Sequence, residues 1–324
     1  MPAALPVEDV PESAGPREAQ SRLLLITPPN SYRTAAYLAA ARRRDIEILV
    51  ASEGRYSLVS ELAGGLQVDL GDAGALQQLL EANARRPFAG VVATDDSVVE
   101  LGSRVAGALG LPHNPPEAAR YSRRKDLSRR VLADADVPVP VYRRIRLDTS
   151  PQPQIASVTF PCVVKPVAMS GSRGVIRADS AGELLEAIDR VREIVAREYS
   201  RESDLSRQLL VEDFVPGKEV ALEGMLSGGR LAVLAIFDKP DPLDGPFFEE
   251  TYYITPSRHP AGIRERVIRR VQQACTALGL REGPVHAEVR IRDGDGVIME
   301  VASRTIGGDC ARLLQFGTGQ GLED

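Results

Sequence analysis

The stretch that is most informative about the fold reads VHAEVRIRDGDGVIMEVA and spans residues 285–302. Apolar and polar residues alternate on both sides of the DGDG segment, and this period of two around turn-forming residues predicts an antiparallel β-hairpin. The first strand places four polar side chains on one face: His286, Glu288, Arg290 and Arg292. The second strand places Val297, Met299 and Val301 on one face and Ile298, Glu300 and Ala302 on the other.

Glu288 and Glu300 become direct cross-strand neighbours if the turn is centred on Gly294. Opposed residues in an antiparallel pair have Cβ atoms roughly 4.5–5.5 Å apart, where two negative charges repel each other. A hard divalent cation between the carboxylates accounts for such a pair, since these ions take oxygen ligands. Two solvated glutamates, or one protonated glutamate, account for it equally well. A two-residue turn centred half a residue later would break the pairing.

Upstream of the hairpin, the first part of the chain alternates between short apolar runs and helical stretches. The predicted strands are 23–26, 46–51 and 90–93, and the predicted helices are 32–44, 73–84 and 96–109. This order is typical of βαβ units around a parallel sheet. No GxGxxG follows the first strand, which argues against an oxidoreductase with a dinucleotide-binding domain. Residues 1–20 are rich in proline and glutamate, and we expect a disordered tail there.

The proline-rich segment Leu111–Pro116 predicts a domain boundary. Beyond it we expect one continuous helix over 117–135, because only Val137 and the prolines that follow it end the helical pattern. A strand over 162–165 and an amphipathic helix around 184–195 come next. The remaining expected elements are a hairpin of 219–226 with 231–237 and a helix from about 263 to 278.

Composition excludes several classes of protein. With 40 basic and 45 acidic residues the net charge is −5, without the basic excess of a nucleic-acid-binding protein. No apolar run approaches the roughly 18–20 residues of a membrane helix, and the N-terminus lacks the features of a signal peptide. The dispersed cysteines Cys162, Cys275 and Cys310 form no CxxC and fit reduced thiols. We therefore expect a soluble, cytoplasmic protein.

The chain has only four lysines beside 36 arginines: Lys125, Lys165, Lys218 and Lys239. Codon bias explains the skew, but the four positions are worth following. Lys165 lies just before the loop Ala168–Gly174, whose small residues let backbone N–H groups close over phosphate oxygens. An ordinary hairpin turn has the same composition. The segment 210–219 can present backbone groups to an adenine edge and a carboxylate to ribose hydroxyls, or its acids can merely solubilise a turn.

Taken together and in this order, these motifs resemble the ATP-grasp superfamily, and most nearly its carboxylate–amine ligases, including the L-amino-acid ligases. The phrase Phe237–Glu250 also looks like that branch, and the resemblance covers Arg22 to the end. It implies an N-terminal α/β domain with a parallel sheet over 21–114 and an ATP-grasp fold of two α+β subdomains over 115–324. The smaller lid subdomain is expected at about 146–210 and the larger one at about 211–324.

The resemblance also implies roles for the matched residues. The nucleotide would be held by Lys125, Lys165, Ser170, Gly171, Ser172, Gly174, Glu212, Asp213, Phe214, Val215, Glu219 and Lys239. Within this set the lysines at 125 and 165 contact phosphates, residues 170–174 form a flap, 212–215 read adenine and 219 holds the ribose. Lys239 is either a further nucleotide contact or part of the substrate wall. Glu288 and Glu300 would bind Mg²⁺ or Mn²⁺, and Arg304 would assist catalysis with Lys165 by steadying the transferred phosphate.

The implied activity is ATP-dependent joining of a carboxylate, expected to belong to an amino acid, to an amine through an acyl phosphate. Two departures from the family pattern keep an alternative open. Ala302 stands where Glu-x-Asn-x-Arg normally has its asparagine, and the chain is expected to lack a further C-terminal lobe. The alternative is an ATP-binding pseudoenzyme or subunit without ligase turnover. Small-molecule substrates are the expected partners, and a homodimer is compatible with the resemblance.

Overall fold

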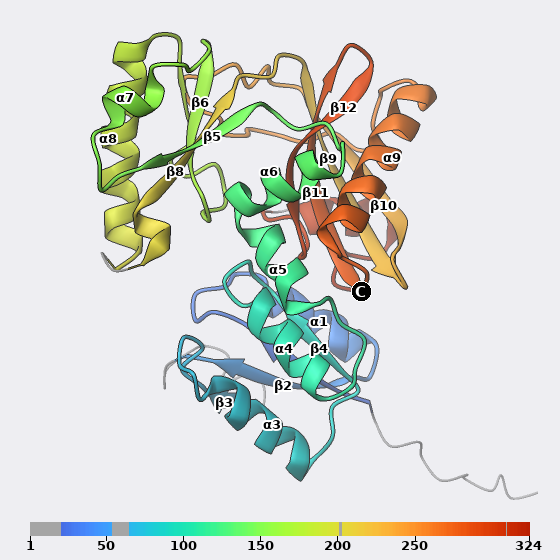
Figure 1. The fold of residues 1–324 in the computed structure, drawn as a ribbon. Helices are drawn as coiled ribbons and strands as arrows, with labels where there is room; N and C mark the ends of the chain where they lie inside the picture. The colour runs from blue at the N-terminus through green and yellow to red at the C-terminus, as the bar shows by residue number, and fades with distance from the viewer. Residues whose placement is uncertain (1–20, 54–64, 201–202, 309) are drawn as a thin grey trace, which may run out of the picture.

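The computed structural model describes residues 21–53, 65–200, 203–308 and 310–324. Three four-stranded sheets organise these residues (Figure 1). In that view the N-terminal sheet lies at the bottom, and the other two lie above it on either side of a pair of short helices. The disordered tail expected over residues 1–20 lies outside the described residues.

The N-terminal sheet is parallel, with strand order β3-β2-β1-β4. Its strands are β1 (Arg22–Ile26), β2 (Glu47–Ser52), β3 (Gly65–Gln67) and β4 (Gly90–Ala93). Its helices are α1 (Thr34–Arg43), α3 (Ala75–Arg85) and α4 (Val99–Ala108). Leu24, Ile26 and Leu79 are fully buried between sheet and helices. The predicted βαβ architecture is confirmed. The short apolar runs form the buried strands of the sheet, and the amphipathic stretches form the helices that cover them.

The continuous helix expected over 117–135 was wrong. Two helices occupy this region, α5 (Pro116–Arg123) and α6 (Lys125–Asp134). Arg124 between them is extended, with φ −96° and ψ 98°. The break frees the backbone N–H of Lys125 to donate to the Val167 carbonyl at 2.8 Å, so the tertiary bond replaces a helical one and ties Lys125 to the segment after Lys165.

The small sheet has the order β5-β8-β6-β7 and is antiparallel. It contains β5 (Tyr142–Arg146), β6 (Cys162–Pro166), β7 (Ile176–Ala178) and β8 (Gln208–Asp213). The helices are α7 (Pro151–Ile155) and α8 (Ala181–Glu198), with a 3-10 turn, η1, at Asp204–Ser206. As expected, one face of α8 is apolar, and its buried residues pack on the sheet. The loop Ala168–Gly174 connects β6 to β7.

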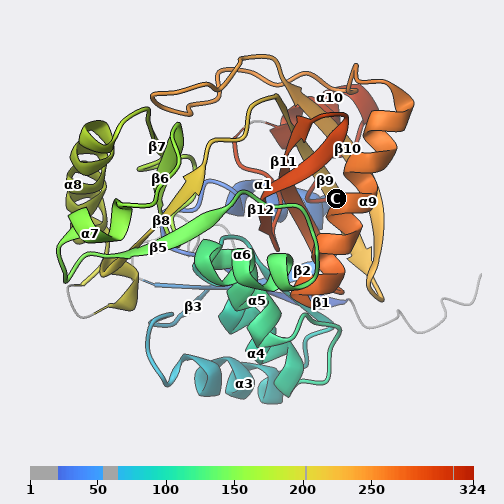
Figure 2. The same ribbon diagram turned by 45° about the horizontal axis from the view of Figure 1, so that its top comes forward.

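The large sheet has the order β10-β9-β11-β12 and is also antiparallel. Its strands are β9 (Lys218–Ser227), β10 (Arg230–Lys239), β11 (Gly283–Arg292) and β12 (Asp295–Ala302). The helices are α9 (Ala261–Leu278) and α10 (Cys310–Thr318). Figure 2 shows α9 along one face of this sheet, where its buried residues share a core with the apolar side chains of β9 and β11. The opposite face carries charged side chains such as Glu219 and Glu288 beside a small apolar cluster that includes Ala221, Ala235 and Phe237.

The final hairpin has the predicted Glu288–Glu300 pairing, but it reaches this register by another route. The turn consists of Asp293 and Gly294 alone, at φ 51° and 76°, which suits a two-residue hairpin turn with both φ angles positive. Met299 then has no partner on β11, and this bulge restores the pairing. The strict alternation expected for the second strand was therefore wrong: Ile298 lies in the core with Val289, away from Glu300.

None of the helices in the described residues is long and apolar enough to cross a membrane. The domain limits drawn from the sequence stay a prediction. The small sheet does draw on residues on both sides of the expected lid, since β5 begins at Tyr142 and β8 ends at Asp213.

Candidate active site

One cavity of about 480 Å³ lies where the three sheets meet. Of the residues singled out from the sequence it is lined by Lys125, Lys165, Ser170, Gly171, Ser172, Glu212, Asp213, Phe214, Val215, Glu219, Glu288, Glu300 and Arg304. Two others, Gly174 and Lys239, do not line it. The fold therefore brings together residues that are up to 179 positions apart in the chain (125 to 304).

Lys165 is held in place by a buried carboxylate. Its ammonium lies 2.6 Å from Oε2 of Glu212, and Arg129 Nε donates to Oε1 of the same residue at 2.6 Å. All three side chains are buried. Burial alone would raise the pKa of Glu212, but Arg129 and then Lys165 hold that pKa below its usual value. The side chain of Glu212 thus serves to position Lys165, whereas the sequence interpretation placed this residue in the adenine-reading strand.

Lys125 reaches the same cavity from the N-terminus of α6. Its ammonium donates to the Met169 carbonyl at 2.7 Å and lies 3.3 Å from Glu300 Oε1. The first of these bonds links the lysine to the start of the glycine-rich loop. The second neutralises one of the two predicted metal carboxylates. A single ammonium therefore connects the loop to β12.

The loop Ala168–Gly174 passes over the cavity and is built for a tight turn. Gly171, Ser172 and Gly174 all have positive φ, at 64°, 53° and 73°. A Cβ on Gly174 would lie 3.0 Å from the Pro166 ring, whereas a Cβ on Gly171 would meet nothing within 4 Å. Gly174 therefore anchors the loop against β6, which explains why it does not line the cavity, while Gly171 stands open at the loop tip.

The segment 213–215 follows the cavity wall, and only its first residue belongs to β8, so the strand expected over 212–215 ends two residues early. The N–H groups of Asp213 and Phe214 donate to Val141 and Pro161, each at 2.9 Å, and the Val215 carbonyl accepts from Arg290 at 2.7 Å. These bonds set the course of the segment and restrict which of its backbone groups can face an adenine edge.

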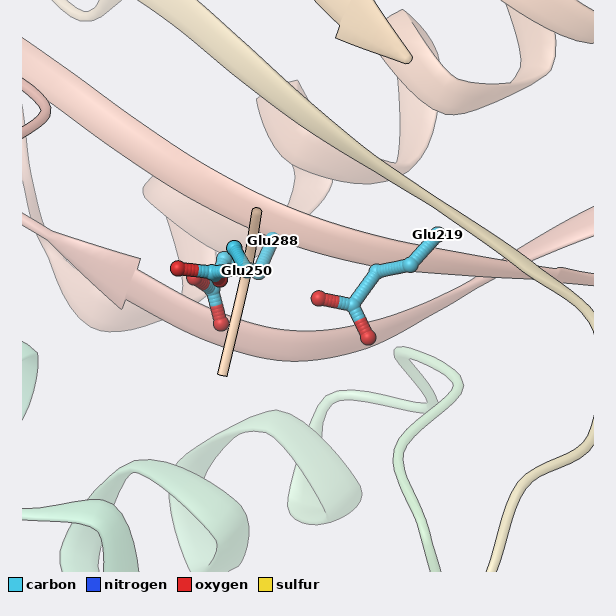
Figure 3. A group of neighbouring side chains, drawn as sticks. All are labelled: Glu219, Glu250 and Glu288. Carbon is cyan, nitrogen blue, oxygen red and sulfur yellow. The ribbon is translucent and has the colours of Figure 1, made fainter. Parts of the chain in front are cut away.

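Lys239 lies behind the cavity wall at the centre of three carboxylates. Its ammonium is 2.7 Å from Glu219, 2.6 Å from Glu250 and 3.0 Å from Glu288, and the lysine is only 2% exposed. Figure 3 shows the three glutamates near one another, with Glu250 and Glu288 overlapping in this view and Glu219 beside them. Burial alone would lower the pKa of Lys239, but the carboxylates, Glu288 foremost, hold it well above its usual value.

The same arrangement acts on the carboxylates. Burial alone would raise the pKa of Glu288, yet Lys239 and then His286 hold it well below the usual range. The pKa of Glu250 is raised, first by burial and then by the charge of Glu288. Glu219 is held on its other side by Arg290, whose Nε lies 2.8 Å from Oε2.

His286 lies beside this cluster on β11 and is fixed by a buried acid. Its Nδ1 is 2.5 Å from Glu223 Oε1, and its Nε2 is 3.7 Å from Glu288. The other oxygen of Glu223 accepts from the Ile306 N–H at 2.9 Å. Glu223 therefore joins β11 to the segment that follows Arg304.

Arg304 faces the cavity from that segment. Its Nε donates to Asp96 of the N-terminal domain at 2.8 Å, and its Nη1 donates to the Thr305 carbonyl. Next to it, Arg33 pairs with Asp95 at 2.5 Å. Arg304, Arg33 and Asp95 thus line the cavity, and the N-terminal domain takes part in both arginine–aspartate pairs.

Sequence reasoning missed several of these residues. Arg129 was overlooked although it follows Lys125 by four positions and so lies on the same face of α6. Glu250 belongs to a quoted phrase but had no assigned role, and Asp96 had no local signal. Their partners come from distant segments, so spacing along the chain could identify only the first.

Comparison with known proteins assigns the family. Residues 158–312 match the ATP-grasp domain. Over these residues the chain belongs to the ATP-grasp family. The match runs from β6 into the start of α10 and includes the glycine-rich loop, the segment 213–215 and the paired glutamates. The sequence-based recognition and fold class are confirmed.

Among its relatives is the uncharacterized protein y4rH of Sinorhizobium fredii, 30% identical over 287 residues, which are 87% of this chain and 58% of the relative. A D-alanine--D-alanine ligase of Gloeobacter violaceus is 30% identical over 205 residues, or 60% of this chain and 63% of that enzyme. The chain thus spans about three fifths of the length of these two relatives.

Among solved structures, an L-amino acid ligase from Bacillus licheniformis matches this ATP-grasp protein with a TM-score of 0.78 and 24% identity, covering 94% of this chain and 73% of that one. At that identity the likeness establishes the fold. Ligases of the carboxylate–amine branch thus recur among the relatives and neighbours of the chain.

Proposed function

We propose that this ATP-grasp protein is an ATP-dependent ligase that joins a carboxylate, most simply that of an amino acid, to an amine. The observation that carries the proposal is the convergence on one cavity of two lysines, an arginine and two facing glutamates under a small-residue loop. Cations and carboxylates arranged in this way suit phosphoryl transfer, where the protein contributes positioning and charge stabilisation rather than a covalent nucleophile.

In this proposal the nucleotide lies along the cavity with its base at 213–215 and its triphosphate beneath the loop 170–174. Lys165 and Lys125 approach the phosphates from opposite walls, and Arg304 stands at the far end, where the γ-phosphate would lie. Glu219 takes the ribose hydroxyls. The ion pairs support these two roles, because Glu212 holds the ammonium of Lys165 in place and Asp96 holds the guanidinium of Arg304.

The proposed reaction has two steps. A substrate carboxylate oxygen attacks the γ-phosphorus of ATP, the bond to the β–γ bridging oxygen breaks, and ADP leaves with that electron pair. An amine then attacks the acyl carbon, inorganic phosphate leaves and the amine proton is lost, so an amide remains. Both steps bring anionic groups together or release them, and Lys125, Lys165 and Arg304 neutralise that charge.

Magnesium fits the residues that would hold it. Glu288 and Glu300 supply two facing carboxylates, and oxygen is the ligand that this hard cation prefers. When bound it would neutralise phosphate charge at the transferring group. Ala302 removes the amide oxygen that the related motif places nearby, so the protein offers two glutamate side chains for this purpose.

The test is a panel of amino acids, assayed singly and in pairs for ADP and phosphate release with Mg·ATP. We expect at least one pair to release ADP faster than either member alone, and mass spectrometry to detect the corresponding amide. If ATP raises the thermal midpoint but no pair stimulates ADP release, the alternative holds, and the protein is an ATP-binding pseudoenzyme or a subunit without ligase turnover.

The nucleotide part of the proposal is tested by Lys165→Ala. Loss of a buried phosphate partner should weaken ATP binding by at least about tenfold, since a hydrogen bond to a charged group contributes roughly 1.5–3 kcal/mol. Lys218→Ala, which removes an exposed lysine at the start of β9, is the matched control. Calorimetric titration that finds equal ATP affinities in both variants would contradict the site.

A further inference from the structure

Lys239 has more acidic neighbours than its own charge requires. One ammonium lies within 3.0 Å of carboxylates from three places in the fold: Glu219 on β9, Glu250 between β10 and α9, and Glu288 on β11. An ammonium has three N–H donors and no acceptor, so each donor is matched by one carboxylate.

The three carboxylates are spaced as they would be around a metal ion. One oxygen of each lies within 4.8 Å of the others, and the ammonium of Lys239 stands among them. Without a cation at this point, three acidic groups that are largely screened from water would repel one another. The lysine therefore supplies the positive charge that a divalent cation would otherwise supply.

Glu288 also belongs to the proposed magnesium site. Glu288 also faces Glu300 across the hairpin, and these two are the proposed magnesium ligands. Glu300 in turn lies 3.3 Å from the ammonium of Lys125. Each proposed metal carboxylate is therefore already engaged by a lysine, Glu288 by Lys239 and Glu300 by Lys125.

We propose that Lys239 is an internal counter-cation, which occupies the carboxylate cluster of Glu219, Glu250 and Glu288 and keeps free divalent cations out of it. The second half of the inference rests on the proposed function: the phosphates of an arriving metal–nucleotide complex attract the ammonium away from Glu288 as the metal takes its place. The site would then accept the metal together with the nucleotide and discriminate against free metal.

Glu250 is one of the three carboxylates that hold this counter-cation. It makes the shortest of the three contacts, 2.6 Å, and it comes from the segment after β10 rather than from the sheet. Movement of that segment would therefore carry away one of the three carboxylates that retain Lys239.

The experiment measures binding of Mn²⁺ alone, without nucleotide, by the decrease of its free electron paramagnetic resonance signal. Wild type should bind Mn²⁺ weakly, and Lys239→Met should bind it at least about tenfold more tightly, because the cation then replaces the missing charge. Lys239→Arg, which keeps the charge, and Lys218→Met, which removes an exposed lysine elsewhere, should both match wild type. Equal Mn²⁺ affinity of Lys239→Met and wild type would overturn the inference.

The measurement separates this inference from the proposed function, since it uses neither nucleotide nor turnover. If the protein fails to bind ATP but Lys239→Met still binds Mn²⁺ more tightly than wild type, the proposed function is contradicted and the counter-cation role of Lys239 is supported. Where Lys239→Met is too unstable for titration, its thermal midpoint should rise with Mn²⁺ more steeply than that of wild type, because a ligand bound only by the native state stabilises it. An equal rise in both proteins would contradict the inference.

Discussion

Glu223 accepts hydrogen bonds from two segments that are not neighbours in the chain, the His286 ring and the Ile306 N–H. Burial alone would lower the pKa of His286, but the charge of Glu223 and its hydrogen bond raise that pKa to about 9 from 6.5. The imidazole is therefore protonated at neutral pH in the folded protein and largely neutral in the unfolded chain. The positive charge of the His286 ring therefore stabilises the folded state through its ion pair with Glu223.

This difference predicts a pH dependence of stability. Because the folded-state pKa is raised, the stabilisation is fully present below pH 6.5 and is lost as the pH rises through about 9. We expect the thermal midpoint of wild type to fall between pH 7 and 9.5, and that of His286→Gln to fall less. His259→Gln, which changes a partly exposed ring, should keep the wild-type slope. Parallel slopes for His286→Gln and wild type would contradict the charged pair.

At the scale of elements, turns and bulges place the functional side chains. The bulge at Met299 restores the Glu288–Glu300 register after a turn that would have missed it, and the extended residue Arg124 frees the N–H of Lys125. Each irregularity costs regular hydrogen bonds in its own element. In return, a side chain or backbone group is directed into the cavity.

The turn from β8 into β9 offers a test at this scale. Gly217 has φ 120°, and a Cβ there would lie 2.1 Å from the Ile291 carbonyl oxygen. Gly217→Ala should therefore reduce the free energy of unfolding by about 2–4 kcal/mol, through both backbone strain and steric overlap. Gly228→Ala, at φ 56° with nothing within 4 Å, should cost only about 1 kcal/mol. Urea unfolding measures both, and equal losses would show that the close approach at Gly217 is unimportant.

At the scale of the whole molecule, the N-terminal domain completes the cavity. Asp96 reaches Arg304 across 208 positions of sequence, and Arg33 and Tyr32 line the same end. Burial alone would lower the pKa of Arg304, but Asp96 and then Glu300 raise it. The parallel sheet thus acts as a platform for an arginine that belongs to another domain.

Asp96→Asn tests this long-range support. Without its charged partner the guanidinium is free to turn toward Glu300, and we expect about a tenfold lower kcat for amine-dependent ADP release, since misplaced groups lose much of their catalytic effect. The dissociation constant for ATP should change little. Asp148→Asn, which removes the exposed partner of Arg146, should leave both values unchanged. A large loss of ATP affinity with unaltered kcat would contradict the positioning role.

The sequence alone predicted β1, β2 and β4 of the parallel sheet and the two strands of the final hairpin, because strands and helices are specified by periodic burial within ten to twenty residues. It did not predict β3 (Gly65–Gln67). It was also sufficient to single out Lys125, Lys165, Glu288 and Glu300. The break at Arg124 and the bulge at Met299 could not be predicted from it, since both depend on hydrogen bonds to other segments. Only the tertiary structure decided the ion-pair partners, Glu212 with Lys165, Asp96 with Arg304 and three glutamates with Lys239. Any acid can pair with any base, and packing alone determines which of them are buried together.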